Sequence, residues 1–146
     1  MRRRLRRRAD ERGAVTLEFV VLAPVLLALL GLLIMAGRVA IASNSVEAAA
    51  DEAARSASIS RTAGGARSAA QDGARRSLAE QDLKCASVHV DVDTAGFAVP
   101  VGLPAQVRTT VTCVVRLADL ALPGFPGSRT VTATAVSPLD TYRERG

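Results

Sequence analysis

Few side chains in this sequence are of the types that carry catalysis or bind metals. The single histidine, His89, alternates with Asp91 and Asp93. One imidazole and two carboxylates on one strand face could hold a divalent ion weakly, but a solvated strand face is the default interpretation of such a pattern. The sequence contains no G-x-S-x-G, C-x-x-C, H-E-x-x-H or phosphate-binding loop motif. We therefore expect no catalytic residues, no metal, no cofactor and no small-molecule substrate, and we predict that the protein is not an enzyme.

The carboxylate in the most unusual position is Glu18, which borders a long apolar run. Residues 19–37, FVVLAPVLLALLGLLIMAG, contain no charged side chain. A helix of this length spans about 28 Å, close to the roughly 30 Å thickness of the hydrocarbon core of a bilayer. A helix that is apolar on every face does not suit the surface of a small soluble protein. The run therefore predicts a transmembrane helix, and a carboxylate at its edge is a candidate functional residue because it is costly in lipid.

The net charge of +5 originates in the first thirteen residues. The chain has nineteen Lys and Arg against fourteen Asp and Glu. Residues 1–13, MRRRLRRRADERG, contain seven of the basic and two of the acidic residues, so the rest of the chain contains twelve of each and is neutral. A neutral main part with few aromatic residues argues against nucleic-acid binding. By the positive-inside rule, the arginines place the N-terminus in the cytoplasm and residues 38–146 outside.

The residues alone leave open whether this segment is retained. A basic start, an apolar run and the triplet Ala40-Ile41-Ala42 also imitate a secretory signal peptide with a cleavage site after Ala42. The apolar run is longer than the roughly 7–15 residues usual in a signal peptide, and Arg38 separates it from the triplet. Cleavage after Ala42 is therefore the alternative to a retained anchor.

The residues around Glu18 resemble a processing site. Gly13 ends the basic leader, and Glu18 follows five positions later, directly before the apolar helix. This arrangement resembles the prepilin cleavage site of type IV pilins and pseudopilins. The string GAVTLEFVVLAPVLLALLGLLIMAGRV is similar in particular to the opening of the TadE-like family, the pseudopilins of the Flp or tight-adherence pilus system. The resemblance is strong over residues 12–61 and only architectural beyond them.

The resemblance implies a function and a set of partners. A prepilin peptidase would cut between Gly13 and Ala14. The protein would be a single-pass protein of the cytoplasmic membrane in contact with lipid. It would join or support a surface filament together with other pilin or pseudopilin subunits and the pilus assembly machinery. Glu18 and Phe19 would be the assembly residues, with Glu18 pairing with the new amino group of a neighbouring Ala14. On its own, Glu18 is a favourable charge in the first turn of a helix. The alternative function is a secreted or single-pass membrane-anchored binding module with an ordinary signal peptide or anchor.

Beyond the apolar run, the sequence predicts two helices. Residues 38–61 carry small apolar residues at spacings of three and four, which indicates one apolar face that suits either a small core or a subunit interface. The residues of this face are Val39, Ala42, Val46, Ala49, Ala50, Ala53 and Ala57. Ala63-Gly64-Gly65 is expected to break the helix, and residues 66–83 are expected to form a second one.

After Leu83 the apolar pattern changes to a period of two, which indicates strands. The candidates are residues 88–93, 106–117 and 129–136, with loops at 94–105 and 122–127. We therefore predict an α+β fold with a long N-terminal transmembrane helix continuing into an extracytoplasmic helix, a second helix, and a small three-stranded antiparallel sheet. The predicted parts are a basic cytoplasmic leader (1–13), a transmembrane helix (14–37), an extracytoplasmic helical region (38–83) and a small β domain (84–146).

Cys85 and Cys113 lie in the region expected outside the cytoplasm, where an even number of cysteines suggests a disulfide. The bond would close a loop of about 28 residues and stabilise the domain by roughly 3 kcal/mol. Direct pairing of the two cysteines across antiparallel strands would place the even-numbered, apolar valines of the first strand opposite even-numbered residues of the second strand. The apolar residues of the second strand are odd-numbered, so the apolar faces of the two strands would not coincide. Either a bulge intervenes or Cys85 precedes the strand. Two free thiols are the alternative.

Overall fold

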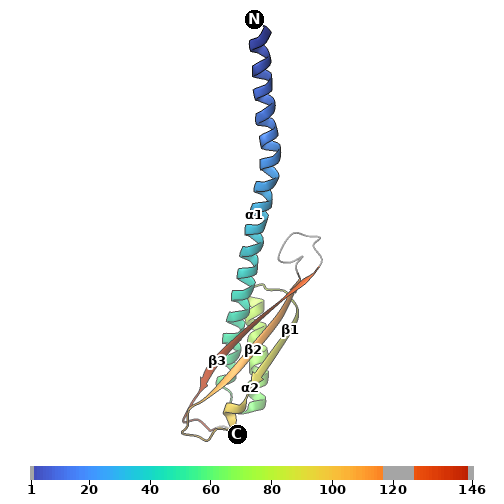
Figure 1. Ribbon diagram of the computed structural model, residues 1–146. Coiled ribbons are helices and arrows are strands. Elements are labelled where there is room, and N and C mark those ends of the chain that lie inside the picture. The colour runs from blue at the N-terminus through green and yellow to red at the C-terminus, as the bar shows by residue number, and fades with distance from the viewer. Residues whose placement is uncertain (1, 117–126, 145–146) are drawn as a thin grey trace. The chain divides into compact units, whose positions relative to one another are not determined.

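A computed structural model describes the backbone of residues 2–116 and 127–144 and, within these ranges, the side chains from residue 20 onward (Figure 1). The chain divides into two compact units, Met1–Gly37 and Arg38–Gly146. In chain order the elements are α1 (Arg2–Ser58), α2 (Ala63–Glu80), β1 (Cys85–Asp93), the short 3-10 helix η1 (Ala95–Ala98), β2 (Ala105–Arg116) and β3 (Ser128–Leu139). The predicted α+β fold is confirmed.

Residues 38–58 of α1 supply much of the core of the second unit. Alanine is the strongest helix former, and the small apolar face predicted for this segment is the face that the structure buries. The α1 residues that are at most 1% exposed are Ala42, Val46, Ala49, Ala50, Ala53, Ala54 and Ala57. Val39, at the start of the face, is half-buried. Because alanine has a single side-chain carbon, the main chain of α1 can approach its neighbours closely.

The predicted break between two helices is present, but its predicted position at Ala63-Gly64-Gly65 is wrong, because the break lies at residues 59–62. The chain leaves α1 after Ser58, and these three residues form the first turn of α2. Thr62 caps the new helix, because its hydroxyl accepts a hydrogen bond of 3.0 Å from the main-chain N–H of Gly65. The N–H groups of a first turn have no partner within the helix, so a capping side chain satisfies one of them.

We expect the substitution Thr62→Ala to lower the free energy of unfolding by about 1 kcal/mol, since it leaves the Gly65 N–H without its acceptor. Urea denaturation of the full chain in detergent, followed by circular dichroism, measures this loss. Thr62→Ser keeps the hydroxyl and should retain most of the stability. Equal midpoints for the alanine variant and the native chain would contradict the capping role.

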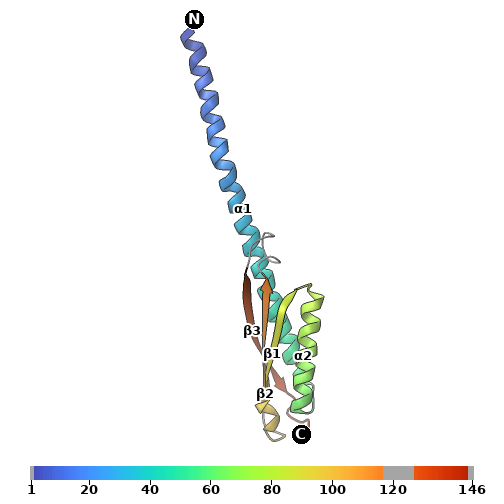
Figure 2. The same ribbon diagram turned by 90° about the vertical axis from the view of Figure 1, so that its right-hand side faces the viewer.

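The three strands form an antiparallel sheet in the order β1-β2-β3, so β2 is central (Figure 2). β2 pairs with β3 from Ala105↔Leu139 to Arg116↔Ser128. β1 starts before its predicted bounds and β3 extends beyond both of its own. The predicted strand end at Leu117 and most of the predicted loop at 122–127 lie outside the described residues.

One face of the sheet is covered by the helices (Figures 1 and 2). The β2 residues at most 1% exposed are the predicted odd-numbered ones, Val107, Thr109, Val111, Cys113 and Val115. The hydroxyl of Thr109 donates a hydrogen bond of 2.9 Å to the main-chain oxygen of Ala50, which ties β2 to α1. α2 packs against α1 at Gly73, where an added Cβ would lie 2.8 Å from the Ser56 hydroxyl. The core is thus built from two small-residue helices laid on one β surface.

Pro138 lies inside β3, opposite Gln106, although the sequence places the end of this strand at Val136. Proline has no main-chain N–H and cannot donate to the neighbouring strand. Such a residue is tolerated in an edge strand, where alternate N–H positions face away from the sheet. Its presence is therefore consistent with the place of β3 at the edge.

Candidate functional site

The most distinctive surface of the first unit is its apolar helix segment. Every large apolar side chain from Val20 to Met35 is between 39% and 69% exposed. The most apolar window of this stretch has a mean hydropathy of 2.7, and none of it is buried within the protein. Water strongly disfavours a continuous apolar surface of this kind. By length and composition the segment can cross a membrane, and it fits a single-pass anchor near the N-terminus.

The four residues of the predicted processing and assembly site precede this segment. Gly13, Ala14, Glu18 and Phe19 belong to α1 by their backbone. Their side chains lie outside the described part of the chain. The processing site and the pairing of Glu18 with a new amino terminus therefore remain predictions from the sequence.

The alternative cleavage site after Ala42 lies within the folded unit. Ala42 is 1% exposed and belongs to the core formed by α1, α2 and the sheet, whereas Ile41 is 66% exposed. The hydroxyl of the next residue, Ser43, donates a hydrogen bond of 3.1 Å to the main-chain oxygen of Val39. A cut after Ala42 would separate these two partners and remove a core residue from the mature protein.

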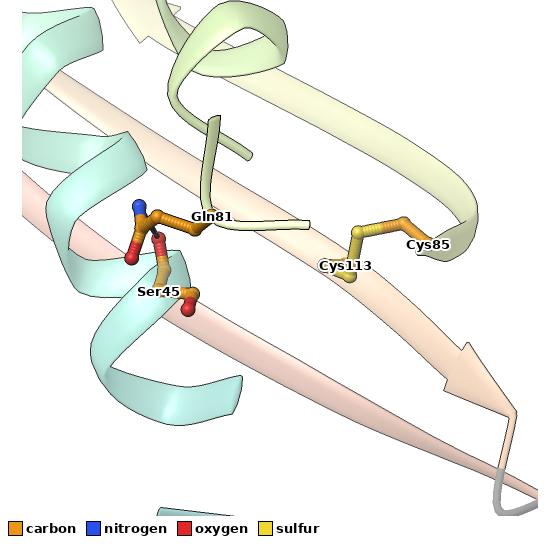
Figure 3. The surroundings of a disulfide bond; sticks show 4 residues. All are labelled: Ser45, Gln81, Cys85 and Cys113. Atoms are coloured by element: carbon orange, nitrogen blue, oxygen red, sulfur yellow. Dashed lines mark hydrogen bonds between the residues drawn. A yellow bond between two sulfur atoms is a disulfide. The ribbon is translucent and has the colours of Figure 1, made fainter. Parts of the chain in front are cut away.

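Cys85 and Cys113 form a disulfide in the structure, with their Cα atoms 5.5 Å apart (Figure 3). Cys113 is fully buried on the inner face of β2, and Cys85 is half-buried at the start of β1. Nearby, the side-chain amide of Gln81 donates to the main-chain oxygen of Ser45 over 3.4 Å. The bond and this contact together hold the α2–β1 connection against β2 and α1.

A β-bulge at the start of β1 resolves the register conflict noted in the sequence. Cys85 lies opposite Val115, and Val88 lies opposite Cys113, with the irregularity between Cys85 and Ser87. The extra residue shifts the pairing by one position, so even-numbered valines of β1 face odd-numbered residues of β2. The two cysteines are therefore diagonal neighbours rather than direct partners, and the apolar faces of both strands coincide.

The histidine and its two aspartates lie on the solvent side of β1. His89, Asp91 and Asp93 are all exposed. The Asp93 carboxylate accepts a hydrogen bond of 3.0 Å from the main-chain N–H of Ala95, which forms part of the turn into η1. Among the residues that the structure describes, no group of three His, Cys, Asp or Glu side chains could hold a metal ion. The arrangement is that of a solvated strand face.

An open depression of about 450 Å³ lies between α1 and α2. Its charged lining residues have mixed signs and are Asp51, Glu52, Arg55, Arg76 and Glu80. Arg76 and Glu52 form an ion pair of 3.6 Å with side chains 60% and 40% exposed. A solvated pair of this kind contributes little free energy. The three acidic and two basic side chains are interspersed, so this open surface carries no concentrated charge that would select a ligand.

A threonine-rich outer face of the sheet was not recognised as a surface from the sequence. Thr110 and Thr134 share a hydrogen bond of 3.0 Å, and Thr112 and Thr132 share one of 3.2 Å, across the β2–β3 pair. The signal was present as alternating threonines in the segments TTVT and TVTAT. Such alternation gives only the hydroxyl face of a strand. It does not say which strand lies beside it.

The comparison with protein families gives one match, to the family described as TadE-like protein, over residues 13–55. It covers the predicted processing site, the apolar segment and most of the α1 residues that enter the core. The match confirms the resemblance to the TadE-like family that the sequence shows over its N-terminal part. Comparisons with curated proteins and with solved structures give no match.

Proposed function

We propose that this chain, whose residues 13–55 match the TadE-like family, is a pseudopilin-like structural and assembly subunit of a Tad pilus or a related surface system. In this proposal a prepilin peptidase removes residues 1–13, the apolar segment anchors the mature protein in the cytoplasmic membrane, and residues 38–146 lie outside. The partners are the peptidase and the other subunits of the assembly.

The observation that carries the proposal is the junction at Gly37. The preceding segment is exposed and apolar, and the residues that follow form a separate compact unit with its own core. A helix that can lie in lipid, followed by a small folded unit, is the architecture expected of a subunit that is held in the membrane before it is assembled. The disulfide within the folded unit supports an oxidising compartment on that side.

Cleavage after Gly13 changes the electrostatics of the N-terminal region. The leader carries the entire net charge, so the mature chain has equal numbers of basic and acidic side chains. The new α-amino group at Ala14 would then be the nearest cation to Glu18 of the same or a neighbouring chain. In an apolar surrounding a carboxylate is stable only beside such a partner. This pairing would give neighbouring subunits a preferred axial register.

Intact-mass analysis of the mature protein from cells that contain the pilus system tests the processing step. We expect a chain beginning at Ala14, and we expect Gly13→Leu to retain the full leader because the side chain obstructs the peptidase subsite. Gly37→Leu is the matched control, since it adds the same side chain at the other end of the apolar segment, where no atom lies within 4 Å of the added Cβ. A mature chain beginning at Ser43 would contradict the proposal and support an ordinary signal peptide, and an intact Met1 would leave a plain anchor.

A Glu18→Ala variant separates processing from assembly. It should still be cut after Gly13, because the carboxylate is not at the scissile bond, and it should be lost from the assembled filament fraction. Immunoblots of sheared surface material against membranes measure the distribution. Normal incorporation of the variant would show that Glu18 has no assembly role.

A further inference from the structure

The sheet has one edge that its own chain leaves open. β3 pairs with β2 on one side only, and within residues 2–116 and 127–144 no main-chain hydrogen bond reaches its other side along Ser128–Leu139. Residues 130–138 of this strand, TVTATAVSP, carry no charge. A long uncharged edge strand rich in threonine and valine has a high tendency to pair with another strand.

The opposite edge, formed by β1, is protected. His89, Asp91 and Asp93 place charges or a titratable group at alternate positions along it. A β-bulge interrupts the pairing at its start, and α2 packs beside it (Figure 2). Charges, bulges and covering helices are the usual devices by which proteins block unwanted strand addition. Their concentration on β1 contrasts with their near absence from β3.

The position of Pro138 indicates which groups of β3 face the open side. Pro138 lies opposite Gln106 and cannot donate to it, so its nitrogen occupies a position that points away from β2. Residues at even spacing from Pro138 share this direction in a regular strand. Their main-chain N–H groups, those of Thr130, Thr132, Thr134 and Val136, are therefore the donors available to an added strand. Pro138 itself ends the usable edge.

The two faces of β3 specify the side chains of the added strand. On the inner face, Val131 and Ala133 are only half-buried, whereas their direct partners on β2, Cys113 and Val111, are fully buried. The core therefore lacks cover at this edge, and an apolar side chain on the added strand would complete it. On the outer face the cross-strand hydroxyl pairs end at the exposed Thr132 and Thr134, so a hydroxyl-bearing neighbour would continue them.

We propose that β3 is a docking edge at which an extended, uncharged segment of a different polypeptide adds antiparallel as a fourth strand, with small or β-branched apolar residues toward the core and hydroxyl residues toward the outer face. The proposal rests on the membrane-anchored, assembly-associated function above. In that setting the fourth strand is the contact through which the folded unit is held by a neighbour of the assembly.

A second copy of this chain is a poorer occupant. Residues 38–58 of α1 run in the same direction as β3 (Figures 1 and 2). Antiparallel pairing of two β3 strands by a two-fold axis would place the Arg38 ends of the two folded units at opposite ends of the pair, whereas the apolar segments that precede Arg38 in both copies have to enter the same bilayer. Parallel pairing by a two-fold axis along the strands would set the threonine face of one copy beside the half-buried Val131 and Ala133 of the other.

Amide hydrogen exchange of the full chain in lipid nanodiscs tests the edge. The probe is a peptide of about eight alternating threonine and valine residues with a lysine at each end, and the control peptide has aspartate in place of valine. We expect the first peptide to slow exchange at least about tenfold at Thr130, Thr132, Thr134 and Val136, and to leave β1 amides unchanged. The aspartate peptide should slow none of them. Absence of slowing, or equal slowing on β1, would overturn the proposal.

Two variants distinguish the edge from the threonine face. Thr132→Pro removes one outward N–H without a bond to β2 and should weaken peptide binding at least about tenfold. Thr112→Lys is the matched control, because Thr112 is the hydroxyl partner of Thr132 on the same face but lies in the central strand. Binding should survive this change. Its loss in Thr112→Lys, with folding preserved, would assign the interaction to the face and overturn the edge.

The concentration dependence of the native chain identifies the occupant. Protection of the four β3 amides that rises with protein concentration in the absence of peptide would make a second copy the occupant and overturn our assignment. A photo-crosslinker placed at position 132 in cells should give an adduct that does not have twice the mass of the chain, and none at position 112. The N-terminal mass of the same preparations tests the processing proposal independently, so failure of one proposal is distinguishable from failure of the other.

Discussion

Replacing both cysteines by alanine should lower the free energy of unfolding of the Arg38–Gly146 unit by about 3–4 kcal/mol. The bond closes a loop with a sequence separation of 28, and its loss restores the conformational freedom of that loop to the unfolded chain. Cys113 is also fully buried, so truncation to alanine removes a sulfur atom from the core. Urea denaturation of the full chain in detergent, without reductant, measures the loss.

Reduction of the native protein is the control for this prediction. Dithiothreitol should cause a loss of similar size in the native chain and no change in the double alanine variant. Maleimide labelling of the native protein without reductant should detect no thiol. Two reactive thiols in the folded state, or a double variant as stable as the native chain, would contradict the role assigned to the bond.

The substitution Gly96→Ala should be nearly as damaging, with an expected loss of about 2–4 kcal/mol. Gly96 is buried in η1, and a Cβ there would collide with the main-chain oxygen of Gln106 at the start of β2. Main-chain atoms of a paired strand cannot rotate away as a side chain can. The shift would also displace Phe97, a buried aromatic residue of the core.

Gly64→Ala is the matched control for this substitution. Gly64 lies in the first turn of α2, and no atom lies within 4 Å of an added Cβ. Alanine is a better helix former than glycine, so this variant should be as stable as the native chain or slightly more stable. Thermal unfolding of the two variants side by side measures the difference. Equal stability of Gly96→Ala and Gly64→Ala would show that the close approach at η1 is easily relieved.

Patterns with a clear period predicted the architecture of the folded unit. The spacing of Ala42, Val46 and Ala53 identified the buried face of α1, and the odd-numbered residues of β2 identified the inner face of the sheet. Both patterns reflect burial, because burial requires apolar residues at every turn of a helix or at every second position of a strand. This period is visible in the sequence. The apolar segment could be predicted for a similar reason, since a helix in lipid requires apolar side chains along its whole length.

Single contacts decided the boundaries, and these were less predictable. The glycines at 64 and 65 suggest a break, but one hydroxyl from Thr62 makes them the start of a helix. The bulge between Cys85 and Ser87 was one of two alternatives that the residues left open, and the pairing partner on β2 decided between them. Pro138 was compatible with a strand only because that strand lies at an edge. In each instance the deciding atom belongs to another position of the chain.

The functional residues likewise fall into those that local sequence predicts and those that depend on the fold. Gly13 and Glu18 are predicted to form a site from their spacing to a leader and an apolar run, which are local properties. The open edge of β3 depends on strand order, on the half-burial of Val131 and on the protected state of β1. None of these is a property of the segment TVTATAV considered alone.

The shared use of α1 has a mechanical consequence. The helix that contains the apolar segment also supplies a principal part of the core beneath the sheet, and it is bonded to the strands at Thr109 and at Ser137, whose hydroxyl donates 3.0 Å to that of Ser58. A force applied at Arg38, where the folded unit begins, is therefore carried by the α1 residues of the core and by these two contacts to β2 and β3.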